Sequence, residues 1–357
     1  MGLSYDPDTD HQRPMKQTVN PASTTRSRRR PRVILATALA LLCSCGGGEV
    51  VERLTVLAMD TAVELTVVAP DRTTAQAALE AAAEALRNVE AWASTTDPGS
   101  ELARVNAAGG SEQLGRPLAE CLELALAAAA DSDGAFDPTI GPLLAAYGFT
   151  GETWRVPPPE ELAAALTRVG YERLRFADGG LELPPGFVLD LGGAAKGYAV
   201  DRACSALENA GATAGLVNAG GDIACFGERP GGGSWRVGVQ HPRAPSELYA
   251  VLELDGGAVA TSGDYERCFT VGSVRYHHLL DPRSGRPARE LTSVTVTAPS
   301  CAAADAYATA AFILGPRGGR ALLEEHPELE GLLIGVAPGL EAHETGGFTA
   351  DYETLGD

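Results

Sequence analysis

The chain has 357 residues, of which 45 % are hydrophobic and 21 % are charged. This composition excludes disordered and collagen-like proteins and suits one large domain or two ordinary ones. The 28 Lys/Arg and 47 Asp/Glu residues give a formal net charge of −19, so most of the surface repels a polyanion and we expect no nucleic-acid partner.

The first 45 residues differ from the rest in charge and predict an export signal. A basic run at residues 26–32 precedes a mostly apolar stretch of ten residues, 33–42, and then Cys43-Ser44-Cys45. Ten residues are too few to span a bilayer. The order of basic, apolar and small residues is typical of a signal peptide.

Leu42-Cys43-Ser44-Cys45 resembles a bacterial lipobox and predicts Cys45 as the lipidated first residue of the mature chain, with residues 46–52 as a tether. Lipidation at Cys43, or a signal peptide that is cleaved without lipidation, are the alternatives. Met15 is a second candidate start, which would leave residues 1–14 untranslated, and the general and twin-arginine export routes both stay open. We expect a lipid-anchored protein on the extracytoplasmic face of the cell membrane, in the periplasm or on the outer surface.

Five cysteines follow the predicted lipobox, an odd number without C-x-x-C spacing. They are Cys121, Cys204, Cys225, Cys268 and Cys301. This pattern predicts neither a disulfide framework nor a zinc site, so we expect these side chains to pack as small apolar groups.

Periodicity predicts the first elements of the body, residues 53–350. Residues 54–68 alternate as a strand that breaks near Met59-Asp60-Thr61, and the Ala-rich residues 73–93 predict an amphipathic helix. Further helices are expected at residues 117–130, from Pro157 to Gly170 and at residues 194–210, with a short strand at residues 187–191.

The second half is predicted to be rich in strands. Strands are expected at residues 215–218, 223–226, 235–240, 248–254, 259–262, 274–280 and 292–298. Ser300 is a good N-cap for a helix that ends at Gly315. Because strands and helices do not alternate one for one, we expect an α+β fold with mixed layers and a mainly antiparallel sheet. No linker is evident, so residues 53–350 are expected to form one domain.

Two glycine turns could carry chemistry. Residues 190–193 lead into a predicted helix with Lys196 in its first turn, where amide groups and an ammonium suit a phosphate. A plain turn with a surface lysine is the alternative. Residues 218–222 precede a strand rather than a helix, which excludes the dinucleotide fingerprint and predicts a tight hairpin.

Asp305 and Thr309 lie four apart, on one face of an Ala-rich helix. A carboxylate and a hydroxyl are hard oxygen ligands of the kind that Mg²⁺ takes. The alternative is a solvated Asp305 with Thr309 bonded to its own helix. His277 and His278 point to opposite faces of a predicted strand, so at most one can enter a given cleft as a proton shuttle, and a surface histidine is the alternative.

Eight segments of the chain occur in the order found in the ApbE family, which the chain resembles over about residues 52–337. They include Met59-Asp60-Thr61, residues 135–142, residues 190–201 and residues 278–282. ApbE proteins are FAD:protein FMN transferases, and many are envelope lipoproteins. The resemblance implies a Mg²⁺-dependent enzyme that cleaves the pyrophosphate of FAD, joins FMN to a Thr or Ser hydroxyl of an envelope redox protein, and releases AMP.

The resemblance also implies roles for individual residues. Contacts to FAD are expected from Met59, Ala135, Phe136, Asp137, Asp190, Lys196 and Leu280. Gly193, through its carbonyl, would bind Mg²⁺ with Asp305 and Thr309. His278 would take the proton of the acceptor hydroxyl, and the metal would neutralise charge on the pyrophosphate.

Three positions depart from the family pattern. Asp60 replaces the usual glycine of Met-Gly-Thr, Thr96 stands where an aromatic residue is found, and Ala308 stands at a position that is sometimes acidic. Two other functions would use the same site: a Mg²⁺-dependent FAD pyrophosphate hydrolase and a non-catalytic FAD-binding lipoprotein. The sequence does not separate hydrolase from transferase, because water and a hydroxyl compete for the same phosphorus.

Overall fold

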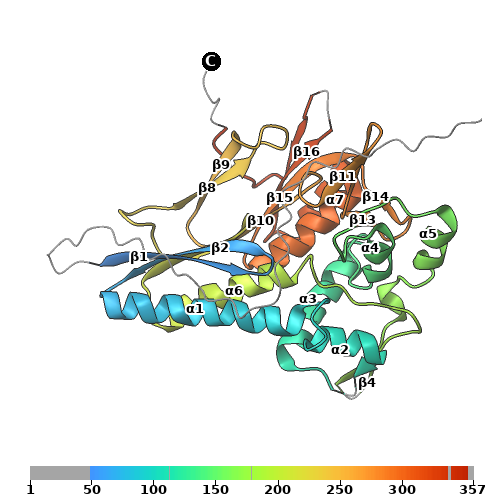
Figure 1. Cartoon of the computed structure of the whole chain (residues 1–357). Helices are drawn as coiled ribbons and strands as arrows, with labels where there is room; N and C mark the ends of the chain where they lie inside the picture. Colours follow the sequence, from blue (N-terminus) through green and yellow to red (C-terminus); the bar gives the residue numbers. More distant parts are fainter. Residues whose placement is uncertain (1–48, 112, 178, 337–338, 353–357) are drawn as a thin grey trace, which may run out of the picture. The chain divides into compact units, whose positions relative to one another are not determined.

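An eight-stranded sheet forms the centre of the protein (Figure 1). The computed structural model describes residues 49–111, 113–177, 179–336 and 339–352, so the predicted export signal and Cys45 lie outside the described residues. The strand order is β1-β2-β6-β7-β10-β15-β16-β17, and every neighbouring pair is antiparallel. The α+β class with a mainly antiparallel sheet is confirmed.

The strands of this sheet place apolar side chains in two cores, one on each face, although every second side chain of β1 is exposed. The strands are β1 (Val50–Ala58), β2 (Thr61–Ala69), β6 (Ala214–Ala219), β7 (Asp222–Phe226), β10 (Gly257–Gly263), β15 (Leu291–Ala298), β16 (Glu330–Gly335) and β17 (Ala342–Glu344). In β2, Val63, Leu65 and Val67 belong to the core beneath the helices, whereas Val68 belongs to the core on the opposite face. The period-2 pattern therefore buries apolar side chains on both sides.

A layer of helices covers one face of the sheet. Its members are α1 (Arg72–Ala93), α3 (Arg116–Asp131), α6 (Ala195–Asn209) and α7 (Cys301–Glu324). Their buried faces are rich in alanine, which allows the helices to approach one another closely. Figure 1 shows α1 running along β1 and β2, and α7 lying against β15.

The opposite face is covered by the two-stranded ribbon β8 (Trp235–Gln240) and β9 (Leu248–Leu254). Trp235, Val237 and Leu252 of the ribbon pack with Val259 and Ile334 of the sheet. This second core explains why the inner strands of the sheet are apolar on both faces.

Smaller elements connect these layers. The helices are α2 (Glu101–Ala108), α4 (Gly141–Tyr147), α5 (Pro159–Leu166) and the 3₁₀ turn Tyr171–Arg173. A three-stranded sheet contains β3 (Gly110–Ser111), β5 (Gly180–Glu182) and β4 (Arg175–Ala177). Two hairpins follow β10, namely β11 (Cys268–Val271) with β12 (Val274–His277), and β13 (Leu280–Asp281) with β14 (Arg286–Pro287).

The strand predicted at residues 187–191 is wrong. Its side chains alternate in burial as in a strand, but Val188 forms only one isolated bridge, to Ile140. The side chain of Asn106 takes the place of a neighbouring strand, because its amide donates to Leu189 O at 2.9 Å and its oxygen accepts from Leu189 N at 2.8 Å.

One other predicted element differs in extent. The strand expected at residues 274–280 is divided into β12 and β13, because His278 and Leu279 leave the ladder. The helix end expected at Gly315 is confirmed, because Gly315 has non-helical backbone angles (φ 76°, ψ −177°), and a second helical stretch follows it directly to Glu324 within α7. Glycine tolerates this backbone conformation, and the following Pro316 suits the start of a helical turn.

The five cysteines at residues 121, 204, 225, 268 and 301 are all free thiols, as the spacing predicts. Within the described ranges, no helix is both long enough and apolar enough to cross a membrane.

Candidate active site

Two tight hairpin turns lie side by side where neighbouring strands of the central sheet end, a region called the sheet edge below. The β1–β2 turn consists of Met59 and Asp60, whose φ angles are 52° and 59°. In the β6–β7 turn, Gly220 has a φ of 62°, and an added Cβ would lie 2.8 Å from Thr61 Oγ1. The glycine is therefore required both by its backbone angle and by the neighbouring turn.

The segment before α6 forms the next part of the site. The amide of Gly192 donates to Asp190 Oδ1 at 2.9 Å, and the amide of Asp190 donates to Pro138 O at 2.8 Å. Burial raises the pKa of Asp190, while the nearby Arg267 guanidinium opposes the rise. The segment that contains the predicted FAD contacts Ala135, Phe136 and Asp137 is thus joined, through Pro138, to the glycine turn.

Lys196 forms an ion pair with a carboxylate that lies at the start of β7. Its Nζ is 2.9 Å from Asp222 Oδ2, and the two side chains are 30 % and 2 % exposed. Burial disfavours the ammonium, but the charges of Asp222 and Asp305 outweigh it and raise the pKa of Lys196 above its usual value. Lys196 is therefore a fixed cation at the edge of the sheet.

Asp305 lies close to this ion pair. The amide of Gly197 donates to Asp305 Oδ2 at 3.3 Å. Burial and repulsion from Asp222 raise the pKa of Asp305, whereas Lys196 lowers it. One ammonium therefore faces two buried carboxyl groups. With both carboxyl groups ionised the cluster has an excess negative charge, which a second cation would neutralise.

Gly193 brings the glycine turn next to α7. An added Cβ on Gly193 would lie 3.0 Å from the ring of Phe136 and 3.5 Å from Thr309 Oγ1. The Thr309 hydroxyl is 3.1 Å from Ser262 Oγ, so it is not limited to bonding its own helix. The glycine turn and α7 therefore bring four residues close together, namely Gly193, Phe136, Thr309 and Ser262.

The two adjacent histidines point to different surroundings. His277 Nε2 bonds to Ala288 O at 2.8 Å, and its ring packs edge-on against Phe312 at 5.7 Å, so His277 belongs to the core. His278 Nδ1 is buried, and no described residue bonds to it. Burial, followed by the charges of Arg267, His277 and Lys196, lowers the pKa of His278 to about 3. His278 is thus a neutral imidazole close to two cations.

Magnesium can be tested against the donors that are present. Within the described ranges, no group of three or more His, Cys, Asp or Glu residues is placed to hold a metal. Magnesium usually takes one or two carboxylates and completes its shell with substrate phosphates and water. The carboxylate of Asp305, the nearby hydroxyl of Thr309 and the backbone of Gly193 fit that requirement, and the excess of carboxyl groups around Lys196 favours a cation.

Other predicted residues have structural partners. Asp137 is buried and accepts from Thr139 N at 2.7 Å and from Tyr171 N at 3.0 Å, so it shapes the loop after α3. Ala135 is buried next to it. Leu280 packs in a separate apolar cluster with α4 and α5. Thr96, which stands where the family pattern has an aromatic residue, bonds to Ser94.

Sequence reasoning assigned no role to three residues of this region. They are Asp222, Ser262 and Arg267. Asp222 directly follows a glycine pair at a strand start, and a carboxylate at such a turn is the signal that could have found it. Ser262 and Arg267 give no such signal, because their neighbours lie far away in the sequence.

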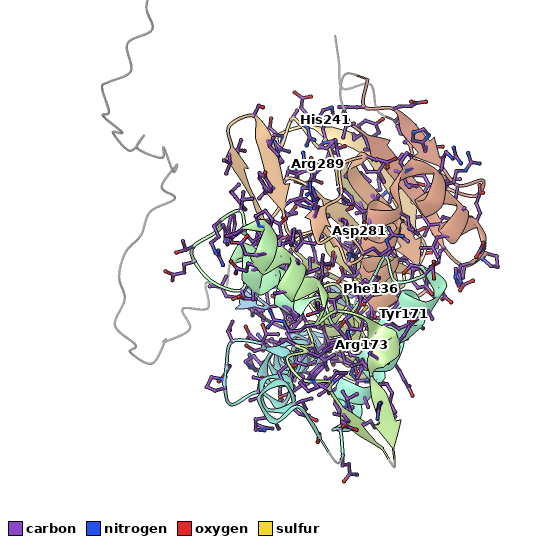
Figure 2. The ribbon with its side chains drawn as sticks, turned by 90° about the vertical axis from the view of Figure 1, so that its right-hand side faces the viewer. Phe136, Tyr171, Arg173, His241, Asp281 and Arg289 are labelled. Atoms are coloured by element: carbon purple, nitrogen blue, oxygen red, sulfur yellow. The ribbon has the colours of Figure 1, made fainter. Side chains whose placement is uncertain are left out.

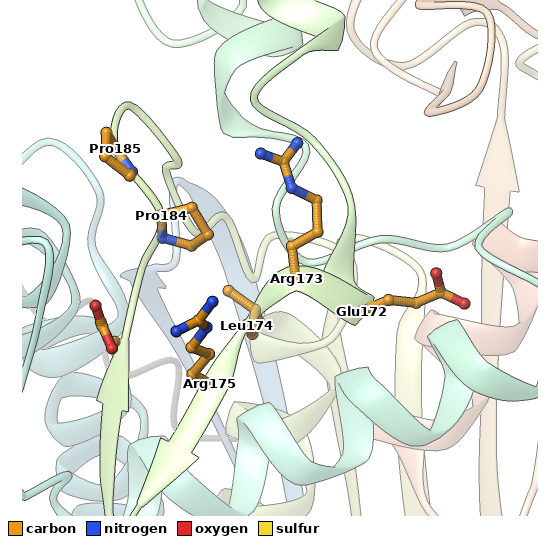
Figure 3. Close-up of a pocket in the computed structure, with 7 residues that line it drawn as sticks. Glu172, Arg173, Leu174, Arg175, Pro184 and Pro185 are labelled. Carbon is orange, nitrogen blue, oxygen red and sulfur yellow. The ribbon is translucent and has the colours of Figure 1, made fainter.

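A surface cavity of about 410 Å³ lies elsewhere, beside the small sheet (Figure 3). Arg173 and Arg175 line it together with Glu172 and Pro184. None of the predicted site residues lines this cavity. In the view of Figure 2, Phe136, Tyr171 and Arg173 are labelled below Asp281.

Comparisons with known proteins show which family the chain resembles. A sequence model described as the ApbE family matches residues 59–333. A Treponema pallidum protein named FAD:protein FMN transferase is 35 % identical, over 72 % of this chain and 77 % of its own length.

Solved structures agree as well. The ApbE protein of Thermotoga maritima has a TM-score of 0.77 and 35 % identity, with 83 % of this chain and 97 % of that chain covered. The flavin transferase ApbE of Vibrio cholerae has a TM-score of 0.75 and 29 % identity, with 84 % and 98 % covered. The similarity therefore spans the whole body that holds the two hairpin turns, α6 and α7.

Proposed function

Because this chain belongs to the ApbE family, we propose that it is a FAD:protein FMN transferase that moves FMN from FAD to a Thr or Ser hydroxyl of an acceptor protein and releases AMP. The observation that carries the proposal is the grouping of Lys196, Asp222 and Asp305 at the sheet edge, close to the neutral His278. A fixed cation, oxygen ligands and a free imidazole are the parts that phosphoryl transfer to a hydroxyl requires.

His278 is the proposed base. A base must be unprotonated to accept a proton, and the lowered pKa of His278 keeps its ring neutral at physiological pH. In the proposed reaction the ring takes the proton of the acceptor hydroxyl, whose oxygen forms a bond to the FMN phosphorus while the bond to AMP breaks. The proton then resides on His278 until solvent removes it.

Lys196 and the glycine turn hold the pyrophosphate in this proposal. The ammonium of Lys196 lies in the first turn of α6, where the positive end of the helix dipole also favours an anion. Asp222 fixes the ammonium in place at 2.9 Å. The FAD contacts assigned to Met59, Phe136 and Asp190 belong to the same proposal.

Gly193, Asp305 and Thr309 would hold Mg²⁺. Bound Mg²⁺ would supply neutralisation of negative charge on the pyrophosphate. The residues of this chain keep the site in shape, since Gly197 fixes Asp305 and Ser262 contacts Thr309.

Export and anchoring are part of the proposal. The basic run at residues 26–32, the mostly apolar residues 33–42 and Cys45 support a lipoprotein on the extracytoplasmic face of the membrane. The acceptor would then be a redox protein of the same compartment.

The test is mass spectrometry of a threonine-bearing acceptor domain after incubation with the full chain, FAD and MgCl₂, with AMP measured in parallel. A mass increase of one FMN less water, with release of AMP and inhibition by EDTA, is the expected result. AMP without modification of any acceptor would indicate an FAD hydrolase. Bound FAD without AMP would indicate a flavin-binding lipoprotein. An acceptor whose target threonine is replaced by alanine is the matched control.

A further inference from the structure

The proposed transfer has a protein as its second substrate, so a surface next to His278 must hold that protein. We infer that the acceptor docks on an aromatic strip consisting of Trp154, Phe269, Val271 and Tyr276, and that the docking segment of the acceptor is apolar and carries carboxylates. This inference rests on the proposed function and names the partner surface of the same site.

The strip is continuous. The rings of Trp154 and Phe269 are 6.3 Å apart, and those of Phe269 and Tyr276 are stacked at 5.3 Å. In the β11–β12 hairpin, Phe269 pairs with Tyr276 and Val271 pairs with Val274. Residues two apart in a strand share a face, so Val271 extends the strip toward the tip of the hairpin.

The outer part of the strip is open to solvent. Trp154 is 37 % exposed and Val271 is 53 % exposed. The inner part is supported by Phe149, whose ring is 5.5 Å from Trp154 and 5.9 Å from Phe269. Exposed aromatic side chains on a rigid support are the usual anchors of protein–protein interfaces.

The strip is joined to His278 through Arg267. The guanidinium of Arg267 donates to Phe149 O, and the backbone carbonyl of Arg267 accepts from His278 N at 3.1 Å. The strand β12, which carries Tyr276, ends at His277, immediately before His278. A protein that docks on the strip is therefore held in a fixed relation to the proposed base.

The charge next to the strip favours an acidic partner. Residues 265–289 contain five arginines and two acidic residues, although the whole chain carries a net charge of −19. Arg289 lies over the ring of Tyr276 at 5.8 Å, and both Arg286 and Arg289 are exposed. Neither guanidinium forms an ion pair with a described carboxylate.

The two arginines also explain why an acidic acceptor would dock on the strip and not elsewhere on the surface. Elsewhere the acidic surface repels an acidic partner. The partner is therefore attracted mainly to the region of Arg286 and Arg289. Other exposed apolar side chains lack this combination: Phe176, which is 53 % exposed on β4, belongs to the separate three-stranded sheet. The aromatic strip combines apolar anchors, neighbouring exposed arginines and continuity with His278.

The test compares acceptor KM values for FMN transfer by three variants of the full chain: Trp154→Ala, Val271→Glu and Arg289→Glu. Phe176→Ala and Arg175→Glu on β4 are the matched controls. We expect each strip variant to raise the acceptor KM about tenfold or more while the Kd for FAD, measured by flavin fluorescence, stays within about twofold of the unaltered protein. Added salt should raise the KM of the unaltered protein and leave that of Arg289→Glu nearly constant.

The outcomes separate this inference from the proposed function. No FMN transfer by the unaltered protein would overturn the proposed function and the docking with it. Transfer with an unchanged acceptor KM in Val271→Glu and Arg289→Glu, two exposed positions whose replacement leaves the core intact, would overturn the docking alone. An equal rise in KM in the β4 controls would also overturn it, because the effect would then not belong to the strip.

Discussion

The backbone amide of Gly197 donates a hydrogen bond to Asp305 Oδ2 at 3.3 Å, across 108 residues of sequence. The contact depends on the absence of a side chain, because a Cβ on Gly197 would lie 2.3 Å from Cys301 O. Asp201 closes the same helix contact by accepting from the amides of Cys301 and Ala302 at 2.7 and 2.9 Å. The packing of α6 on α7 therefore brings Asp305 to Lys196.

Gly197→Ala should separate these two helices. The added methyl group clashes with backbone, which cannot rotate away, so we expect the free energy of unfolding to fall by roughly 1–3 kcal/mol and FMN transfer to fall with it. Urea unfolding measures the first effect. Gly346→Ala, where an added Cβ meets no atom within 4 Å, is the control. Equal stability of the two variants would contradict the close approach.

Asp305→Asn should remove the carboxylate charge while keeping the shape of the side chain. The amide oxygen can still accept from Gly197 N, so the fold should persist, while the loss of the carboxylate should lower Mg²⁺-dependent FMN transfer about 100-fold or more. A magnesium titration of the transfer rate, together with calorimetry of Mg²⁺ binding, checks this expectation. Asp255→Asn, at an exposed acid bonded to Ser234, is the control. Full Mg²⁺-dependent turnover by Asp305→Asn would remove Asp305 from the metal site.

Lys196→Met should destabilise the protein, because Asp222 and Asp305 then repel each other without a compensating cation. Without the ammonium, the buried Asp222 and Asp305 lose their partner, and breaking such a pair costs roughly 3–5 kcal/mol. Adding Asp222→Asn to Lys196→Met should restore most of the stability but not the affinity for FAD. The measurement is thermal unfolding and flavin fluorescence of four proteins: the unaltered chain, Lys196→Met, Asp222→Asn and the double variant. Additive losses would mean that Lys196 and Asp222 act independently.

Much of the fold follows from local pattern. The ribbon strands β8 and β9 match the predicted residues 235–240 and 248–254. The side chains of β8 alternate strictly between buried and exposed, whereas β9 has three consecutive buried residues at its centre. β16 (Glu330–Gly335) escaped prediction because it is buried on both faces and has no alternation. The false strand at residues 187–191 has the right alternation, but the Asn106 side chain occupies its backbone groups.

The site is less accessible to sequence reasoning, because it is assembled from distant segments. The spacing of Asp305 and Thr309 predicts one helix face, and the adjacent histidines predict opposite directions. The pairing of Lys196 with Asp222 depends on how α6 packs on the sheet, and no local pattern contains that information. The resemblance to a family supplied roles that spacing alone leaves open.

His278→Ala should separate binding from transfer. The ring lies beside the site without a described partner for Nδ1, so its removal should leave the Kd for FAD within about twofold, while the transfer rate falls by roughly 10²–10⁴. Because burial lowers the pKa of His278 to about 3, the rate of the unaltered protein should show no acid limb from this group between about pH 5 and 8. His241→Ala is the control. A transfer rate equal to that of the unaltered protein would exclude His278 as the base.

Asp201 should give the stability of the protein a distinctive pH dependence. Burial raises the pKa of Asp201 from 3.8 to about 6, although the amides of Ala302 and Cys301 oppose the rise. Between these two values the folded chain keeps a proton that the unfolded chain releases. The contribution of Asp201 is therefore complete below about pH 4 and is lost as the pH rises through about 6.

Asp201→Asn should remove this dependence. The free energy of unfolding of the unaltered protein, minus that of the variant, should fall by roughly 2–3 kcal/mol between about pH 4 and pH 7, as measured by urea unfolding at each pH. Asp71 caps α1 in the same way but is exposed, and its bonds from Thr74 lower its pKa. Asp71→Asn should therefore give the opposite sign, with stability lost as the pH falls. A difference curve for Asp201→Asn with the sign expected for Asp71 would show that the α7 cap is held as a carboxylate, and that the contact between α6 and α7 tolerates a full negative charge.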